Sequence, residues 1–331
     1  MRRLFAPVTL IVLALVLAGS SAAVATDDDE GRGITYAIIG DTPYGAAQFA
    51  AFPQLVSAVN NDPDVRLTVH LGDIKDGASR CSDEYFDQMR ANLDSLEDPL
   101  VLTPGDNEWT DCHRPAAGGY IPTERLARFR SVFYPRPSRS LGIRQKPLKT
   151  QANTPGFEAF VENRLWTAGE VVFATVHVVG SNNDLVPWFG AAETTEQRAE
   201  RLAEYDARLA AALAWLDRTF ALAAEEDARG VVVAMQANMW FNTPLGFTEI
   251  VRRLADRASA FGKPVLLLEG DSHRFTVDRP LAMGSALHGV TTPAPNVTRV
   301  IVEGETIGEW LKLRIDPNAA EVFTWTRMPA P

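Results

Sequence analysis

Four apolar runs in this chain end in the same dipeptide, Gly-Asp, and this repetition constrains the fold more than any other feature. Each run has the length and composition of a buried β-strand. Strands that alternate with helices form largely parallel sheets, and the carboxyl ends of parallel strands lie along one edge. We therefore expect an α/β protein in which four aspartates converge at one edge: Asp41, Asp73, Asp106 and Asp271.

Strand-like and helix-like segments alternate along most of the chain. The expected strands are 34–40, 66–71, 98–103, 157–161, 171–179, 231–235, 264–268, 309–315 and 321–325. The expected helices are 46–60, 82–96, 123–133, 194–220 and 247–261, the fourth opened by a capping box of Thr194 and Gln197. No linker divides the chain, so we expect one domain over 34–327. Prolines and arginines interrupt the pattern at about 114–156, which predicts an excursion over the site.

Converging carboxylates point to a cation. Carboxylates repel one another in a poorly solvated crevice, and a divalent ion among them reverses the local sign of charge. His273 follows Asp271 by two residues and adds a nitrogen ligand at the same strand end. An ordinary turn explains any one Gly-Asp pair, whereas the set of four predicts a metal site. His70 and His177 lie within apolar runs, where we expect core residues.

The N-terminus and the net charge restrict the compartment and the partners. Residues 1–25 combine Arg2 and Arg3, an apolar run and a small-residue cleavage site, which is typical of an export signal. The run is shorter than a membrane span, although an uncleaved anchor is the alternative. We expect residues 26–33 to form a charged leader. The net charge of −10 disfavours a nucleic-acid partner. We expect a secreted or periplasmic monomer with no stable membrane anchor.

The two cysteines, Cys81 and Cys112, bear on the same question of compartment. An even number of cysteines in an exported protein predicts a disulfide. The alternative is a pair of unrelated buried thiols. A serine or cysteine nucleophile finds little support, because the chain has no Gly-x-Ser-x-Gly elbow and we expect both cysteines to be oxidised.

Five blocks in this sequence resemble the motifs of the calcineurin-like metallophosphoesterases, in the same order. The blocks are Gly40-Asp41-Thr42-Pro43-Tyr44, Gly72-Asp73-Ile74-Lys75-Asp76, Gly105-Asp106-Asn107-Glu108, Met235-Gln236-Ala237-Asn238 and Gly270-Asp271-Ser272-His273. The resemblance extends from Ile34 to Trp325. It implies a four-layer αββα sandwich with two divalent metals at the strand ends, where a metal-bound hydroxide attacks the phosphorus of a phosphoric ester.

The ligands differ from the family pattern. Pro43 stands where the family has a metal-binding histidine, and Gln236 and Asp271 replace two further histidines. Asp106 replaces an asparagine. By resemblance, one cation falls to Asp41, Asp73 and His273, and a second to Asp73, Asp106, Asp271 and Gln236. An oxygen-rich set favours Mg²⁺, Mn²⁺ or Ca²⁺ over Zn²⁺. We therefore expect one or two divalent metal ions.

The catalytic residues also depart from the family. Asn107 replaces the histidine that lies near the leaving-group oxygen, and an amide cannot donate a proton at pH 7. We expect slow turnover of alkyl esters and faster turnover of esters with good leaving groups. His113 is a candidate proton donor and Arg114 a candidate clamp for a phosphate oxygen. The alternative for both is a surface loop held by the disulfide.

These residues predict an exported metal-dependent phosphoric ester hydrolase acting on a phosphorylated small molecule or ester. The alternative is a weak or inactive relative that binds a cation or a phosphorylated ligand. An aspartate-nucleophile phosphatase is a third hypothesis, prompted by Asp73 and Asp76. It fails at the first strand, because that chemistry needs a second aspartate where Pro43 stands.

Overall fold

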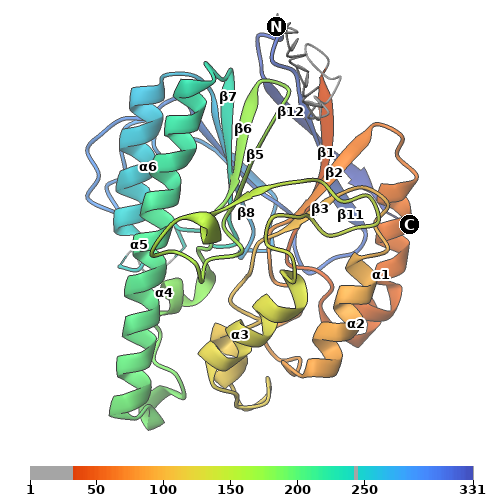
Figure 1. Ribbon diagram of the computed structural model, residues 1–331, viewed down its shortest axis with the longest axis vertical. Coiled ribbons are helices and arrows are strands. Elements are labelled where there is room, and N and C mark those ends of the chain that lie inside the picture. Colours follow the sequence, from red (N-terminus) through yellow and green to blue (C-terminus); the bar gives the residue numbers. More distant parts are fainter. Residues whose placement is uncertain (1–32, 242–244, 331) are drawn as a thin grey trace, which may run out of the picture.

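The computed structural model describes residues 33–241 and 245–330, which form two β-sheets with helices on their outer sides (Figure 1). The predicted export signal and nearly all of the predicted leader lie outside these residues. The strand order in the first sheet is β12-β11-β1-β2-β3. Strands β1 (Ile34–Ile39), β2 (Val65–His70) and β3 (Leu100–Leu102) pair in parallel. Strand β11 (Glu309–Ile315) pairs antiparallel with β1, and β12 (Phe323–Pro329) pairs antiparallel with β11.

The strand order in the second sheet is β4-β5-β6-β7-β8-β10-β9. Its parallel centre consists of β6 (Val171–Thr175), β7 (Gly230–Ala234), β8 (Val265–Glu269) and β10 (Val297–Ile301). The antiparallel strands β4 (Lys149–Thr150), β5 (Arg164–Ala168) and β9 (Thr276–Asp278) lie at its two sides.

Helices cover the outer face of each sheet, on opposite sides of Figure 1. On the first sheet lie α1 (Gly45–Asn60), α2 (Asp83–Leu93) and α3 (Pro122–Phe133), and on the second lie α5 (Thr195–Glu225) and α6 (Thr248–Phe261). The remaining helical segments are short: η1 (Thr110–His113), η2 (Gln151–Asn153), α4 (Gly180–Asp184) and η3 (Gly190–Ala192). The four-layer αββα sandwich expected from the sequence is confirmed.

Hydrophobic clusters lie between the two sheets and between each sheet and its helices. Alternate residues of β1 point to opposite faces. Tyr36 and Ile38 pack between the two sheets, and Ala37 and Ile39 pack against the helices of the first sheet. A strand buried on both faces needs apolar residues at nearly every position, which is why β1 is an almost uninterrupted apolar run in the sequence.

Most predicted elements agree with the structure, and the capping box at the start of α5 is present. The strand expected at 157–161 is wrong. These residues form turns, with the Phe160 N–H donating to the Phe157 carbonyl, and the partner of β6 is β5, at Arg164–Ala168. Strand β5 was not expected because its first residue is a charged one, Arg164. This arginine is buried, and its guanidinium lies over the Tyr134 ring, 4.6 Å from the ring centre. Strands β4, β9 and β10 were not expected.

Candidate metal centre

The four Gly-Asp aspartates converge, as the sequence predicts, at the carboxyl ends of β1, β2, β3 and β8. The Asp271 N–H donates to both carboxylate oxygens of Asp41, at 2.9 and 3.1 Å, and so joins the two sheets. All four side chains are buried or nearly so. A Cβ atom on Gly105 would collide with the Asp73 carboxylate, and one on Gly270 would collide with Asp41. Glycine is needed at these two positions because a neighbouring carboxylate packs against the Cα atom.

Asp41, Asp73 and His273 form a compact group of potential metal ligands. Each offers one ligand atom, and these atoms all lie within 4.8 Å of one another. His273 Nε2 lies 3.5 Å from Asp41 Oδ1, and its Nδ1 lies 3.1 Å from Glu305 Oε1. A carboxylate on the second ring nitrogen orients a ligating histidine. The geometry therefore fits one divalent cation at the position that the sequence predicts for the first of two.

Tyr44 lies beside the same group, and the sequence analysis gave it no role in the site. Its hydroxyl donates to Asp73 Oδ2 at 2.9 Å, lies 3.2 Å from His273 Nε2 and accepts from the Asn107 amide at 2.9 Å. Pro43 offers no ligand, but the next residue along the chain brings an oxygen atom to the same ligands. No sequence signal marks it, because Tyr44 alone looks like an ordinary aromatic residue at the start of a helix.

The third block holds the Asp73 carboxylate in place. Asn107 donates from its backbone N–H to Asp73 Oδ1 at 3.1 Å and from its amide to Oδ2 at 2.9 Å. Glu108 Oε1 accepts the N–H groups of Asp73, at 3.0 Å, and Gly105, at 2.7 Å. Glu108 therefore ties the loop after β2 to the loop after β3, a role that the sequence analysis missed.

Asp106, Asp271 and Gln236 lie on the other side of Asp73. A Cβ atom on Gly180 would lie 2.7 Å from Asp106 Oδ2 and 2.9 Å from Asp271 Oδ1, so both carboxylates approach this glycine. Gln236 Nε2 donates to Asp73 Oδ2 and to Asp106 Oδ1, at 3.2 Å each. The structure thus brings together all six residues that the sequence predicts as metal ligands.

Ser181 is a further side chain in this region. Its hydroxyl lies 2.8 Å from Asp106 Oδ2 and 2.8 Å from Asp111 Oδ1. It belongs to α4, where residues 181–184 all have positive φ, between 51° and 64°. Left-handed backbone is costly for non-glycine residues. Arg208 of α5 stabilises it here by donating to the side chain and the carbonyl group of Asn183.

His113 and Arg114 lie at the rim. His113 Nδ1 lies 2.7 Å from the Thr110 carbonyl oxygen, and its ring meets that of Phe189 edge-on. The Arg114 side chain is 46% exposed and forms an ion pair with buried Asp111 at 2.6 Å. A Cβ atom on Gly77 would lie 2.8 Å from Arg114 Nη1 and 3.0 Å from Asn107 Oδ1, so Arg114 and Asn107 lie against the same glycine. Arg114 is therefore next to the ligand group and open to solvent.

Comparison with known proteins identifies the family. Residues 34–197 match the family model of the calcineurin-like phosphoesterases, and they include the first three motif blocks. The chain belongs to this family. Members of the family use divalent metals and act on phosphoester substrates. No curated protein matches the sequence.

Three solved structures were found to be similar to this chain. One is the protein TT1561 of Thermus thermophilus, with a TM-score of 0.43, 11% identity, and coverage of 90% of this chain and 99% of that chain. Another is GAP50, the anchor in the inner membrane complex of Plasmodium, with a TM-score of 0.46, 9% identity, and coverage of 90% and 89%. The purple acid phosphatase PPD1 of yellow lupin (Lupinus luteus) has a TM-score of 0.42, 11% identity, and coverage of 91% and 54%.

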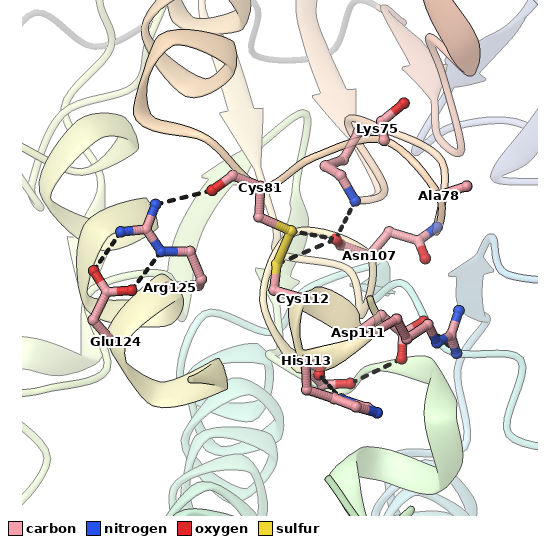
Figure 2. Close-up of a disulfide and its surroundings, with 12 residues drawn as sticks. Lys75, Ala78, Cys81, Asn107, Asp111, Cys112, His113, Glu124 and Arg125 are labelled. Carbon is pink, nitrogen blue, oxygen red and sulfur yellow. Dashed lines mark hydrogen bonds and ion pairs between the residues drawn. A yellow bond between two sulfur atoms is a disulfide. The ribbon is translucent and has the colours of Figure 1, made fainter. Parts of the chain in front are cut away.

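The predicted disulfide is confirmed, and it underlies the candidate metal centre. Cys81 and Cys112 are joined, fully buried, with their Cα atoms 5.8 Å apart (Figure 2). The Asn107 carbonyl oxygen lies 3.5 Å from Cys81 Sγ and accepts a hydrogen bond from Lys75 Nζ at 2.6 Å. A disulfide sulfur has no hydrogen to donate, so the sulfur contact is one of packing. The bridge ties the loop after β2 to the loop after β3.

Burial disfavours the negative charge of the carboxylates in the candidate site. Burial raises the pKa values of Asp41, Asp73 and Asp271, and the charge of Asp106 raises all three further. Burial also raises the pKa of Asp111 to about 7. A divalent cation would stabilise the ionised forms.

Burial also disfavours the charged forms of the cationic side chains in the site, because it lowers their pKa values. Burial lowers the pKa of Lys75, and the negative charges of Glu108 and Asp73 offset only part of this shift. Burial also lowers the pKa of His273, but its hydrogen bond with Asp41 and the charges of Asp41, Glu305 and Asp271 outweigh this effect. The net shift of the His273 pKa is upward.

The helices of the described residues, 33–241 and 245–330, include none with the length and apolar composition of a membrane span.

Proposed function

We propose that this phosphoesterase is an exported hydrolase of phosphoric esters that depends on a divalent cation bound by Asp41, Asp73 and His273. The observation that carries the proposal is this buried group, whose three ligand atoms lie within 4.8 Å of one another. Two carboxylates and one imidazole, with the Tyr44 hydroxyl beside them, favour Mg²⁺, Mn²⁺ or Ca²⁺. The cation would supply Lewis-acid stabilisation of charge on the phosphoryl group.

The side chains around the cation suggest how a phosphoryl group is bound. The exposed Arg114 guanidinium, oriented by Asp111, is suited to a phosphate oxygen because it offers paired donors. We propose the protonated ring of His113 as the proton donor to the leaving group, through Nε2, because Nδ1–H donates to the Thr110 carbonyl. Burial lowers the pKa of His113, so we expect this donation at acidic pH. Asn107 orients Asp73 and transfers no proton. We expect esters with good leaving groups to be the better substrates.

Export is part of the proposal. The Cys81–Cys112 disulfide supports an oxidising compartment, where such bonds persist. The segment 1–25 has the composition of an export signal. We propose a secreted or periplasmic monomer acting on a phosphorylated small molecule or ester.

A second candidate function is a binding protein without turnover. It is favoured by Asn107, which cannot protonate a leaving group. It is also favoured by the donors that already surround Asp73 Oδ2, from Tyr44, Asn107 and Gln236. Such a protein would bind a cation or a phosphorylated ligand at the same edge of the sheets.

Hydrolysis of aryl phosphate monoesters and diesters separates the two candidates. The chain is treated with a chelator and then supplied with Mg²⁺, Mn²⁺ or Ca²⁺. We expect cation-dependent hydrolysis that falls at least about 100-fold in Asp73→Asn. The exposed Asp87→Asn serves as the matched control and retains full activity. Measurable cation binding without turnover of any ester would favour the binding protein.

A further inference from the structure

The Gln236 amide group is held in one orientation. The side chain is fully buried, two residues beyond the end of β7. Its Nε2 lies 3.2 Å from Asp73 Oδ2 and 3.2 Å from Asp106 Oδ1, and its Oε1 accepts the Gly180 N–H at 2.6 Å. Reversing the amide would set Oε1 against two carboxylate oxygens and an NH₂ group against an N–H group. The contacts therefore decide which atom is nitrogen.

An amide can bind a hard cation only through its oxygen. In Gln236 this oxygen faces Gly180, away from the carboxylates. Turning it toward Asp73 and Asp106 would leave the buried Gly180 N–H without its acceptor, which is unfavourable. The Gly180 backbone cannot easily follow, because it directly precedes the left-handed segment 181–184, where Arg208 donates to the Asn183 carbonyl.

Donor groups of the chain lie beside both carboxylate oxygens of Asp106, and one of them, the Ser181 hydroxyl, is shared with Asp111. One of its oxygens faces Gln236 Nε2 and the other faces the Ser181 hydroxyl at 2.8 Å. In the family pattern, a second cation would lie between Asp73 and Asp106. Here the NH₂ group of Gln236, which carries a partial positive charge, bridges the same two carboxylates.

We propose that this phosphoesterase holds a single cation, at Asp41, Asp73 and His273, and that the Gln236 amide takes the place of the second cation between Asp73 and Asp106. This inference rests on the proposed function, since it assumes that the first cation binds. A site with one cation instead of two also offers less positive charge to the phosphoryl group of the substrate. We therefore infer a preference for phosphodiesters, with one negative charge, over monoesters, with about 1.5 to 2 at pH 7.

Counting bound Mn²⁺ per chain tests the inference. After equilibrium dialysis, elemental analysis should give one Mn²⁺ for the natural chain and two for Gln236→His, which restores a nitrogen ligand. The two ions of the variant should also give a spin-coupled signal in electron paramagnetic resonance. Gln88→His is the matched control for adventitious binding by a new histidine, because Gln88 is exposed on α2, and it should stay at one.

A second variant guards against misfolding of the first. Gln236→Glu places an oxygen between Asp73 and Asp106 and leaves another for Gly180, and it should also bind two ions. Two ions in the natural chain would overturn the inference and leave the proposed function intact. The absence of bound Mn²⁺ from the natural chain would overturn both the inference and the proposed function. One ion in both variants, with each shown to be folded by circular dichroism, would overturn the role of Gln236. Faster hydrolysis of the monoester by the natural chain would overturn the substrate preference.

Discussion

Reducing the Cys81–Cys112 disulfide should cost the protein much of its stability. The two cysteines are 31 residues apart, and loop-closure entropy gives about 3.7 kcal/mol at 25 °C for a loop of this length. Cys81→Ala/Cys112→Ala should lose about 1–2 kcal/mol more, because truncating two fully buried side chains leaves a small cavity. Urea unfolding followed by tryptophan fluorescence gives both values, with the reduced natural chain as the control that keeps the sulfur atoms.

The same reduction should weaken cation binding. The bridge packs under Asn107, whose amide and N–H hold the Asp73 carboxylate. Loss of a group that orients a ligand typically lowers metal affinity by about 10-fold to 100-fold. A reduced chain that unfolds within about 1 kcal/mol of the oxidised chain and binds Mn²⁺ equally well would refute both the loop-closure value and the link to the metal centre.

Three further predictions concern single groups at the site. Tyr44→Phe should weaken Mn²⁺ binding about 10-fold in calorimetric titration with little change in melting temperature, and unchanged affinity would exclude its hydroxyl from the site. Arg114→Ala should raise KM about 10-fold to 100-fold, with Arg114→Lys intermediate and Mn²⁺ affinity unaffected; an unchanged KM would remove Arg114 from substrate binding. Burial raises the pKa of Glu108 from 4.5 to about 7, so its protonated form favours the fold at low pH, and this contribution is lost as pH rises from about 4.5 through 7. The melting temperature of the cation-free protein should fall over that range and the stabilisation by Mg²⁺ should grow; stabilisation that shrinks with pH would contradict the electrostatic argument.

The sequence predicts the site where chemistry repeats at strand ends. The recurrence of Gly-Asp identified four converging aspartates, and the structure shows why glycine precedes two of them, since Gly105 and Gly270 each pack against the carboxylate of another motif. His70 and His177 are fully buried core residues, as expected. These features depend on residue type and local order, which a sequence displays directly.

Other parts of the site depend on contacts between distant segments. Ser181 reaches Asp106 only because four successive non-glycine residues adopt left-handed backbone, which intrinsic preference disfavours. Strand β10 was not predicted because it contains a charged residue, Arg299. In the structure this residue is buried and forms ion pairs with Glu269 and Asp278. Tertiary contacts override the local preference in both places, and one sequence does not show those contacts.

The most direct test of the central claim is anomalous diffraction from crystals of the intact protein grown with Mn²⁺. The account predicts one strong peak in contact with the Asp41 and Asp73 carboxylates and His273 Nε2. A map without a peak at these three side chains, at saturating Mn²⁺, would contradict it.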